Sequence, residues 1–169
     1  MPALARQNRP FLITALVLGA VIPVFAATTT KTAVATCTVT ARAKLSLSSG
    51  TLSFPSADPD STPAIPASGG ALTITAKGRT TINSTVTLVV VASDDLLSSG
   101  NRIGIAALKW TVSGSGFVPG TMSKAAAQTV ASFVSSGSRT GTQSYTLDNM
   151  WTYATGTYNT TLTYTLTAP

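Results

Sequence analysis

The feature that most constrains the fold is an alternation of apolar and threonine-rich positions near the end of the chain. Within residues 157–168, one parity is mostly threonine, and the other consists of Tyr158, Thr160, Leu162, Tyr164, Leu166 and Ala168. Successive side chains of a β-strand point to opposite faces, so this pattern predicts a strand with one apolar and one threonine-rich face. Such a strand has to lie on a hydrophobic core.

A second alternating segment covers residues 33–47. One parity is apolar and the other carries Thr, Arg, Lys and Ser; the apolar parity consists of Ala33, Ala35, Cys37, Val39, Ala41, Ala43, Leu45 and Leu47. We therefore predict a strand over 33–47 with Cys37 facing inward as a buried, unreactive thiol. Because Cys37 is the one cysteine of the chain, it cannot form an internal disulfide, and the alternative is an intermolecular bridge.

Further strands are predicted over 71–81, 84–93, 128–134 and 142–148, where β-branched residues are frequent. The run Leu88–Val91 is apolar on both parities, which predicts a central strand covered on both faces. Between 103 and 112 the apolar parity slips by one residue, which predicts a β-bulge at Ala106–Ala107.

Turn-forming residues separate these strands. The segment 55–70 contains four prolines and two glycines and is predicted to be a surface loop, and 135–141 is predicted to be a turn. Short strands punctuated by Gly, Ser and Pro predict an all-β chain that folds as a single antiparallel β-sandwich of immunoglobulin-like type.

The chain begins with the features of a secretory signal peptide. Arg6 and Arg9 precede an uncharged apolar run over 11–26, which is short for a membrane span of about 20 residues. Small residues lead to a predicted cleavage after Ala26, with an uncleaved anchor as the alternative. We expect a signal peptide over 1–26 and a sandwich domain over 27–169. The protein would be secreted, either extracellular, on the cell surface or in a periplasm, and would meet the membrane only during export.

The composition argues against an enzyme. The chain has no histidine, which removes the commonest general base and metal ligand. The aspartate pairs Asp58–Asp60 and Asp94–Asp95 could in principle supply two carboxylates or part of a calcium site. They stand in Pro-, Ser- and Gly-rich segments, where aspartate commonly forms turns. We therefore predict no catalytic residue, no metal and no cofactor.

The charge and the aromatic residues bear on partners. The net charge is +6, but the basic residues are spread along the chain, so no nucleic-acid partner is expected. Trp110, Tyr158 and Tyr164 share the apolar parity of their strands and are predicted to be in the core. Trp151 and Tyr153 lie in a less regular stretch and are the candidates for contact with a glycan or a protein partner.

The region from 101 to 169, with its Gly-Thr-Tyr turn at 156–158 and its threonine-rich ending, resembles the closing region of bacterial secreted surface proteins of the WxL kind. That family's Trp-x-Leu signature would fall on Trp110-Thr-Val or Trp151-Thr-Tyr, neither of which has Leu in third place. In that family, it is this signature that implies attachment to peptidoglycan.

A second resemblance is to chaperone–usher pilins and spore-coat-U-like subunits. They share an alternating N-terminal strand with a cysteine, the Gly-x-Tyr turn and the threonine-rich last strand. This resemblance implies that one subunit completes the sheet of its neighbour by strand donation. The second cysteine usual in that family is absent near residues 72–78.

These observations predict an exported, non-enzymatic structural or adhesive module of the cell surface or envelope. Its partners would be wall components or neighbouring copies of itself. One alternative is a pilus-type subunit that assembles by donor-strand exchange. Another is a carbohydrate-binding module that uses Trp151 and Tyr153.

Overall fold

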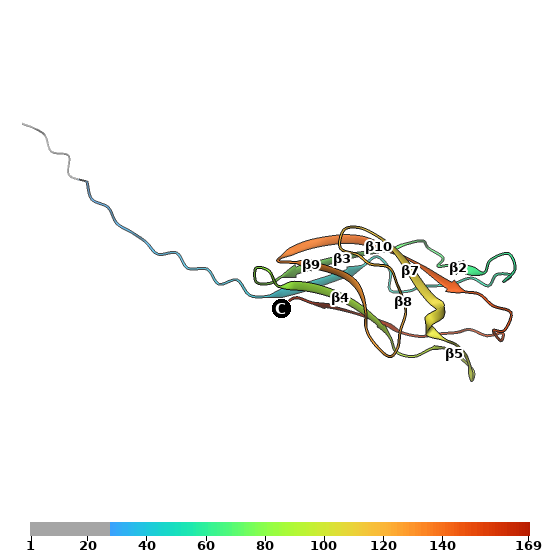
Figure 1. Ribbon diagram of the computed structural model, residues 1–169. Coiled ribbons are helices and arrows are strands. Elements are labelled where there is room, and N and C mark those ends of the chain that lie inside the picture. Colours follow the sequence, from blue (N-terminus) through green and yellow to red (C-terminus); the bar gives the residue numbers. More distant parts are fainter. Residues whose placement is uncertain (1–27) are drawn as a thin grey trace, which may run out of the picture. The chain divides into compact units, whose positions relative to one another are not determined.

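The computed structural model describes residues 28–169, and its strands form an antiparallel β-sandwich (Figure 1). This confirms the prediction of an all-β, antiparallel sandwich. The predicted signal peptide over 1–26, with its cut after Ala26, lies outside the described residues. Residues 38–169 form one unit, and residues 28–37 are described by themselves.

The larger sheet has the strand order β1-β3-β10-β7-β8, with β2 pairing with β10. Its strands are β1 (Arg42–Leu47), β2 (Ala64–Pro66), β3 (Leu72–Arg79), β7 (Leu108–Ser113), β8 (Gly120–Thr121) and β10 (Gly137–Asp148). The smaller sheet has the order β11-β4-β9, made by β4 (Thr85–Ala92), β9 (Gln128–Val134) and β11 (Leu162–Thr167). A separate hairpin consists of β5 (Leu96–Ser98) and β6 (Asn101–Ile103).

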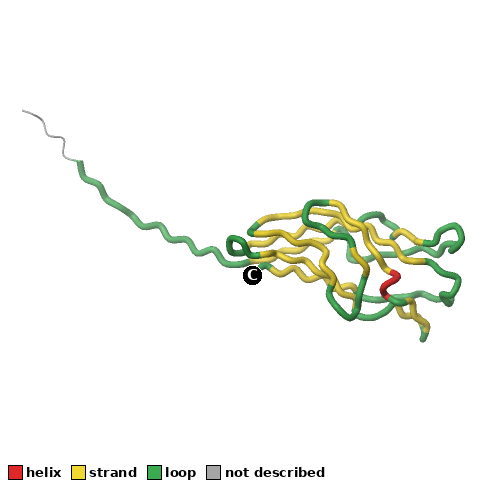
Figure 2. Tube along the Cα trace, viewed as in Figure 1, coloured by secondary structure: helices red, strands yellow, loops and turns green. Residues whose placement is uncertain are grey.

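Helix is almost absent from the described residues, as Figure 2 shows. The exception is a single turn of 3-10 helix, η1 (Ile105–Ala107). Over 28–169, no helix has the length and apolar character needed to cross a membrane.

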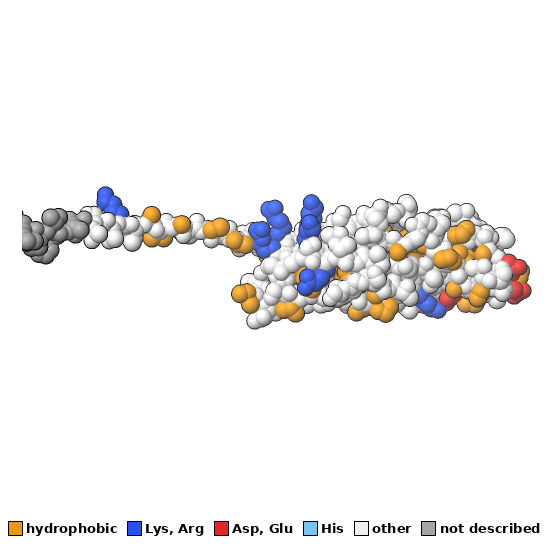
Figure 3. Space-filling view, turned by 90° about the horizontal axis from the view of Figure 1, so that it is seen from above, with side chains coloured by type: hydrophobic (Ala, Val, Ile, Leu, Met, Phe, Trp, Pro, Cys, Tyr) orange, Lys and Arg blue, Asp and Glu red, His pale blue; other side chains and the backbone are white. Residues whose placement is uncertain are grey.

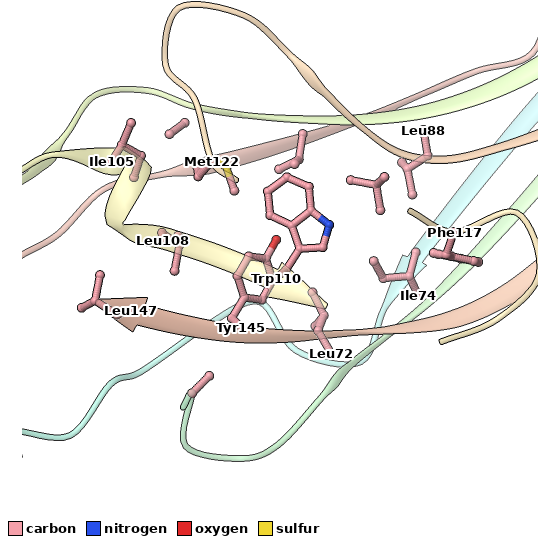
Figure 4. Packing of buried hydrophobic residues seen from close by; sticks show 14 of the residues in the cluster. Leu72, Ile74, Leu88, Ile105, Leu108, Trp110, Phe117, Met122, Tyr145 and Leu147 are labelled. Carbon is pink, nitrogen blue, oxygen red and sulfur yellow. The ribbon is translucent and has the colours of Figure 1, made fainter. Parts of the chain in front are cut away.

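The core lies between the inward faces of the two sheets. Trp110 of β7 is 2% exposed and its ring centroid lies 6.0 Å from that of Tyr145 on β10 (Figure 4). Leu88 and Val90 of β4 face them from the smaller sheet and are almost fully buried. The prediction that Trp110 belongs to the core is confirmed.

Several predicted strands are confirmed and others are shifted. The strand predicted over 128–134 is β9, and β4 is the central strand of its sheet. However, Val89 and Val91 on the outer face of β4 are only half-buried, so the prediction that both faces are covered is wrong. Strand β10 begins at Gly137, so the turn predicted over 135–141 is confined to its first residues, where Ser135 has a positive φ of 64°.

The predicted bulge at Ala106–Ala107 is wrong. The phase slip there arises because η1 inserts a 3-10 turn between β6 and β7. A 3-10 turn advances the chain by three residues per turn, so it changes which parity faces the core just as a bulge does. The register shift that the structure does contain lies between Leu88 and Val89, where β4 pairs with β9.

The strand predicted over 33–47 is only partly present. β1 starts at Arg42, which pairs with Arg79, the last residue of β3. Because the chain turns away after Arg79, residues before Arg42 have no partner strand in the larger sheet. Residues 28–41 are exposed and form no strand, and the prediction that Cys37 is buried is wrong.

Candidate functional site

The sandwich contains a groove of about 1080 Å³ between the two sheets. One wall is the segment 49–57 that follows β1, and the other is the segment 149–162 that leads into β11. Its floor is apolar and includes Leu72, Leu96, Ile103 and Leu108, all of which belong to the main core cluster. Along this seam between the sheets, the groove therefore reaches down to the edge of the core, whose floor side chains are themselves buried.

Two sheet edges flank the seam. β1 pairs with β3 alone and β11 pairs with β4 alone among the strands of residues 28–169, and the two strands approach each other. The inward side chains of β11, such as Leu162 and Leu166, are half-buried, whereas those of the neighbouring β4 are almost fully buried. Leu45 and Leu47 of β1 are also half-buried. Apolar side chains at the seam thus lack the cover that the rest of the core has.

The terminal alternation is explained by this position. The apolar parity faces the core, as predicted, but the strand begins at Leu162 rather than at 157, and Asn159 forms an isolated bridge with Leu97. Tyr158 and Tyr164 are half-buried and pack against the main cluster. The outward backbone groups of β11 have no strand partner in the described part of the chain, which is the condition for adding a further strand.

A small polar network lies behind the seam and joins the two sheets. The Tyr164 hydroxyl donates to Gln143 Oε1 at 2.7 Å and lies 2.6 Å from the Tyr145 hydroxyl. Gln143 is fully buried, and its Nε2 has no hydrogen-bond partner among the described residues. Burial raises the pKa of Tyr164 to about 12 and raises the pKa of Tyr145 further, so both rings stay neutral hydroxyl donors at physiological pH.

The two aromatic candidates both lie on the groove, but in different surroundings. Trp151 is 70% exposed, and its Nε1 donates to Asp60 Oδ1 at 3.0 Å. Tyr153 is half-buried and packs against the core cluster. Of the two, Trp151 alone presents a largely exposed ring to a partner.

The aspartate pairs occupy turns and ion pairs. Asp58 Oδ1 accepts the Asp60 amide at 2.9 Å, which is the turn geometry expected for aspartate in such a loop. Lys124 donates to Asp94 at 2.7 Å and to Asp95 at 2.8 Å, and these bonds hold the pKa of both carboxyls below the usual value. Across residues 28–169, no group of three or more His, Cys, Asp or Glu side chains could hold a metal ion.

Charge is distributed unevenly over the sandwich (Figure 3). Arg42 and Lys44 of β1 lie directly opposite Arg79 and Lys77 of β3, and all four side chains are exposed. Like charges in directly opposed positions of a strand pair are destabilising. We call these four residues the basic pole.

Comparisons with protein-family models, with curated proteins and with solved structures found no match to this chain. The sequence had pointed to Trp151, which lies on the groove, but not to the groove itself. The one sequence signal for it was the pair of alternating segments at 33–47 and 157–168, which predict two strands but not that both lie at sheet edges.

Proposed function

We propose that this protein is a non-enzymatic structural subunit of a bacterial cell surface or envelope. Copies assemble when residues 33–41 of one molecule add as a strand to the free edge of β11 in the next. The observation that supports this most directly is the match between the open, apolar seam beside β11 and an exposed, alternating segment with no partner strand of its own.

The segment has the properties of an added strand. Its apolar parity consists of the small side chains Ala33, Ala35, Cys37, Val39 and Ala41, and its other parity is mostly threonine. At about 3.3 Å per residue it extends roughly 30 Å, which exceeds the length of β11. Addition beside residues 162–164, the part of β11 that lines the groove, would pair backbone groups of both strands and place the apolar parity over the half-buried core.

The segment is poorly suited to fill the groove of its own molecule. To lie beside β11 of the same chain, it would have to reverse direction just before β1. A tight reversal needs residues such as Gly, Asn, Asp or Pro, and residues 33–47 contain none. The lack of turn-forming residues therefore favours a neighbouring molecule over an internal partner.

Binding of a synthetic peptide tests this proposal without requiring assembly to occur. A peptide with the sequence of residues 31–41 should bind protein produced from the full-length sequence and raise its thermal midpoint. The same peptide with Val39→Asp should bind at least about tenfold more weakly, because a carboxylate placed against an apolar floor costs well over 1.4 kcal/mol. The matched control is Thr38→Asp, on the solvent parity, which should bind nearly as well as the native peptide.

Equal binding of the two variant peptides, or no binding of the native one, would contradict strand addition. Cys37 provides a second measurement. Its thiol is exposed in the single chain and should react readily with a maleimide, but it should be protected in assembled material because it lies on the inserted parity.

A further inference from the structure

We infer that the assembly has a fixed head-to-tail polarity because the basic pole of each donor molecule docks against Asp58 and Asp60 of its acceptor. This inference rests on the proposed strand addition and names a second contact between the same two copies. It starts from the charges that the fold leaves without an ion-pair partner.

Internal ion pairs account for most of the acidic residues. Asp94, Asp95 and Asp148 are bridged by Lys124, Arg102 and Lys109. Within the described residues, the acids left without an ion pair are Asp58 and Asp60, both exposed in the loop before β2. We call them the acidic pole.

The two poles lie at opposite ends of the larger sheet. Strand β10 shows this directly, because Gly137 at its start pairs with Gly78, next to Arg79, and Asp148 at its end pairs with Ala64, just after the acidic loop. Over its 12 residues β10 covers about 35–40 Å. Figure 3 shows the basic side chains gathered mostly at one end of the sandwich and acidic ones at the other.

Strand addition would bring unlike poles together. The groove is lined by 49–57 and 149–157, so its mouth lies at the acidic end, next to Trp151 and Asp60. The donor segment continues into β1 at Arg42 with no linker. When residues 33–41 fill the groove of an acceptor, the basic pole of the donor must therefore stop at the mouth of that groove.

Apolar residues accompany the charges at both ends. Ile82, in the turn after β3 at the basic end, is 85% exposed. Met150 and Trp151, beside the acidic loop, are 49% and 70% exposed. A contact between the poles would cover these side chains as well as pair the charges. It would also relieve the repulsion between the opposed cations of β1 and β3.

Charge reversal with rescue tests the inference. Protein from the full-length sequence is unfolded in urea and refolded at high concentration, and assembly is followed by light scattering and electron microscopy. The fourfold variant Arg42→Glu/Lys44→Glu/Lys77→Glu/Arg79→Glu and the variant Asp58→Asn/Asp60→Lys should each assemble about tenfold or more slowly than the native protein at low salt, because like charges now meet at the interface. An equimolar mixture of the two variants should recover assembly, since each reversed pole then meets its complement.

Two controls separate this inference from the proposal on which it rests. The neutral variant Asp58→Asn/Asp60→Asn, which keeps the turn and the acceptor for Trp151, should show an intermediate rate. The native 31–41 peptide should bind all variants equally, because it lacks the basic pole. Raising the salt from about 0.15 to 1 M shortens the screening length from about 8 to 3 Å and should slow native assembly.

The outcomes are distinct. If the native protein assembles and binds the peptide but the reversed variants assemble at the native rate, or their mixture shows no rescue, the polar contact is overturned and strand addition stands. If the native protein neither binds the peptide nor assembles on refolding, both proposals fail.

Discussion

At the scale of single residues, the hydroxyl of Tyr164 joins the two sheets at the groove. It donates to Gln143 Oε1, and the alternative donor, the Tyr145 hydroxyl, lies 3.3 Å from that oxygen. Gln143 is fully buried and its amide nitrogen has no hydrogen-bond partner among the described residues. Its Oε1 therefore depends on these two hydroxyls for hydrogen bonds. A buried amide that loses its best partner carries a desolvation penalty that no water can offset.

We predict that Tyr164→Phe lowers the free energy of unfolding by about 1–2 kcal/mol, the usual cost of an unsatisfied buried polar group. Urea unfolding monitored by fluorescence measures this. Tyr158→Phe is the matched control, because the Tyr158 hydroxyl donates to the Ala154 carbonyl in an exposed loop. If both variants lose the same stability, the network does not hold the sheets together.

The Lys124 cluster predicts how stability depends on pH. Hydrogen bonds from Lys124 lower the pKa of Asp94 and Asp95 in the folded protein. Their contribution to stability is therefore complete above the ordinary aspartate pKa of about 3.9 and is lost as the pH falls through the lower, folded-state values. We expect the thermal midpoint of the native protein to drop in that acid range.

Replacing Lys124 with Met removes the largest cause of both pKa shifts. Lys124→Met should lower the thermal midpoint at pH 7, and the difference from the native protein should shrink as the pH falls and the carboxyls become protonated in both proteins. Thermal melts between pH 2 and 7 measure this. Lys77→Met, which removes a cation without an ion pair, should give a curve parallel to the native one. A Lys124→Met curve that also stays parallel would contradict the assignment.

At the scale of elements, the two-residue strand β8 depends on a glycine. Gly120 pairs with Trp110 across β7 and β8, and a Cβ at Gly120 would lie 2.4 Å from the indole ring. The ring is fixed, because it is buried and its Nε1 donates to the Val118 carbonyl. The indole ring of Trp110 thus occupies the space that a side chain at residue 120 would need.

We predict that Gly120→Ala destabilises the protein by about 1–3 kcal/mol, the usual cost of overpacking. Near-ultraviolet circular dichroism should also change, because the indole must tilt. Gly104→Ala is the control, since nothing lies within 4 Å of a Cβ there and its φ of −57° suits alanine. Full native stability of Gly120→Ala would mean that β8 moves freely away from β7.

The same alternation of apolar and polar residues predicted a strand over 33–47 and a strand over 157–168, and the structure treats the two differently. Residues 162–167 form a paired strand, whereas residues 33–41 remain unpaired. Alternation reports that a segment suits a half-buried sheet position, but it does not report whether a partner strand is available. β3 ends at Arg79, and that boundary decided where β1 could begin. Strand β9 was predictable because its pattern and its partner β4 were both present.

The groove could not be predicted from the sequence for a related reason. Its walls come from segments about 100 residues apart, 49–57 and 149–162, and only the end of the second one, from 157, has a regular pattern. Tyr153 shows the limit at a single position, because its sequence context did not distinguish it from Trp151, yet the Tyr153 ring packs on the core and the Trp151 ring is exposed. Which edges of a sandwich stay open depends on how all the strands are ordered.

At the scale of the whole molecule, the net charge of +6 does not reveal that opposite charges are separated along one axis of the sandwich. Asp94, Asp95 and Asp148 are neutralised by internal ion pairs. The remaining charge therefore separates into the basic and acidic poles. Charge arranged along an axis orients molecules before they touch, which affects the rate of association more than its final strength.

The way β1 joins the segment before it has a consequence under tension. β1 follows residues 38–41 without a break, and all six of its residues pair with β3. A pull along residues 38–41 therefore runs lengthwise along β1 and strains its hydrogen bonds in shear, all at the same time. A strand held beside β11 and leaving at the acidic end would be loaded in the same way. Under such a pull the backbone hydrogen bonds of each strand share the load. The sandwich should therefore resist stretching, because these bonds cannot break one after another.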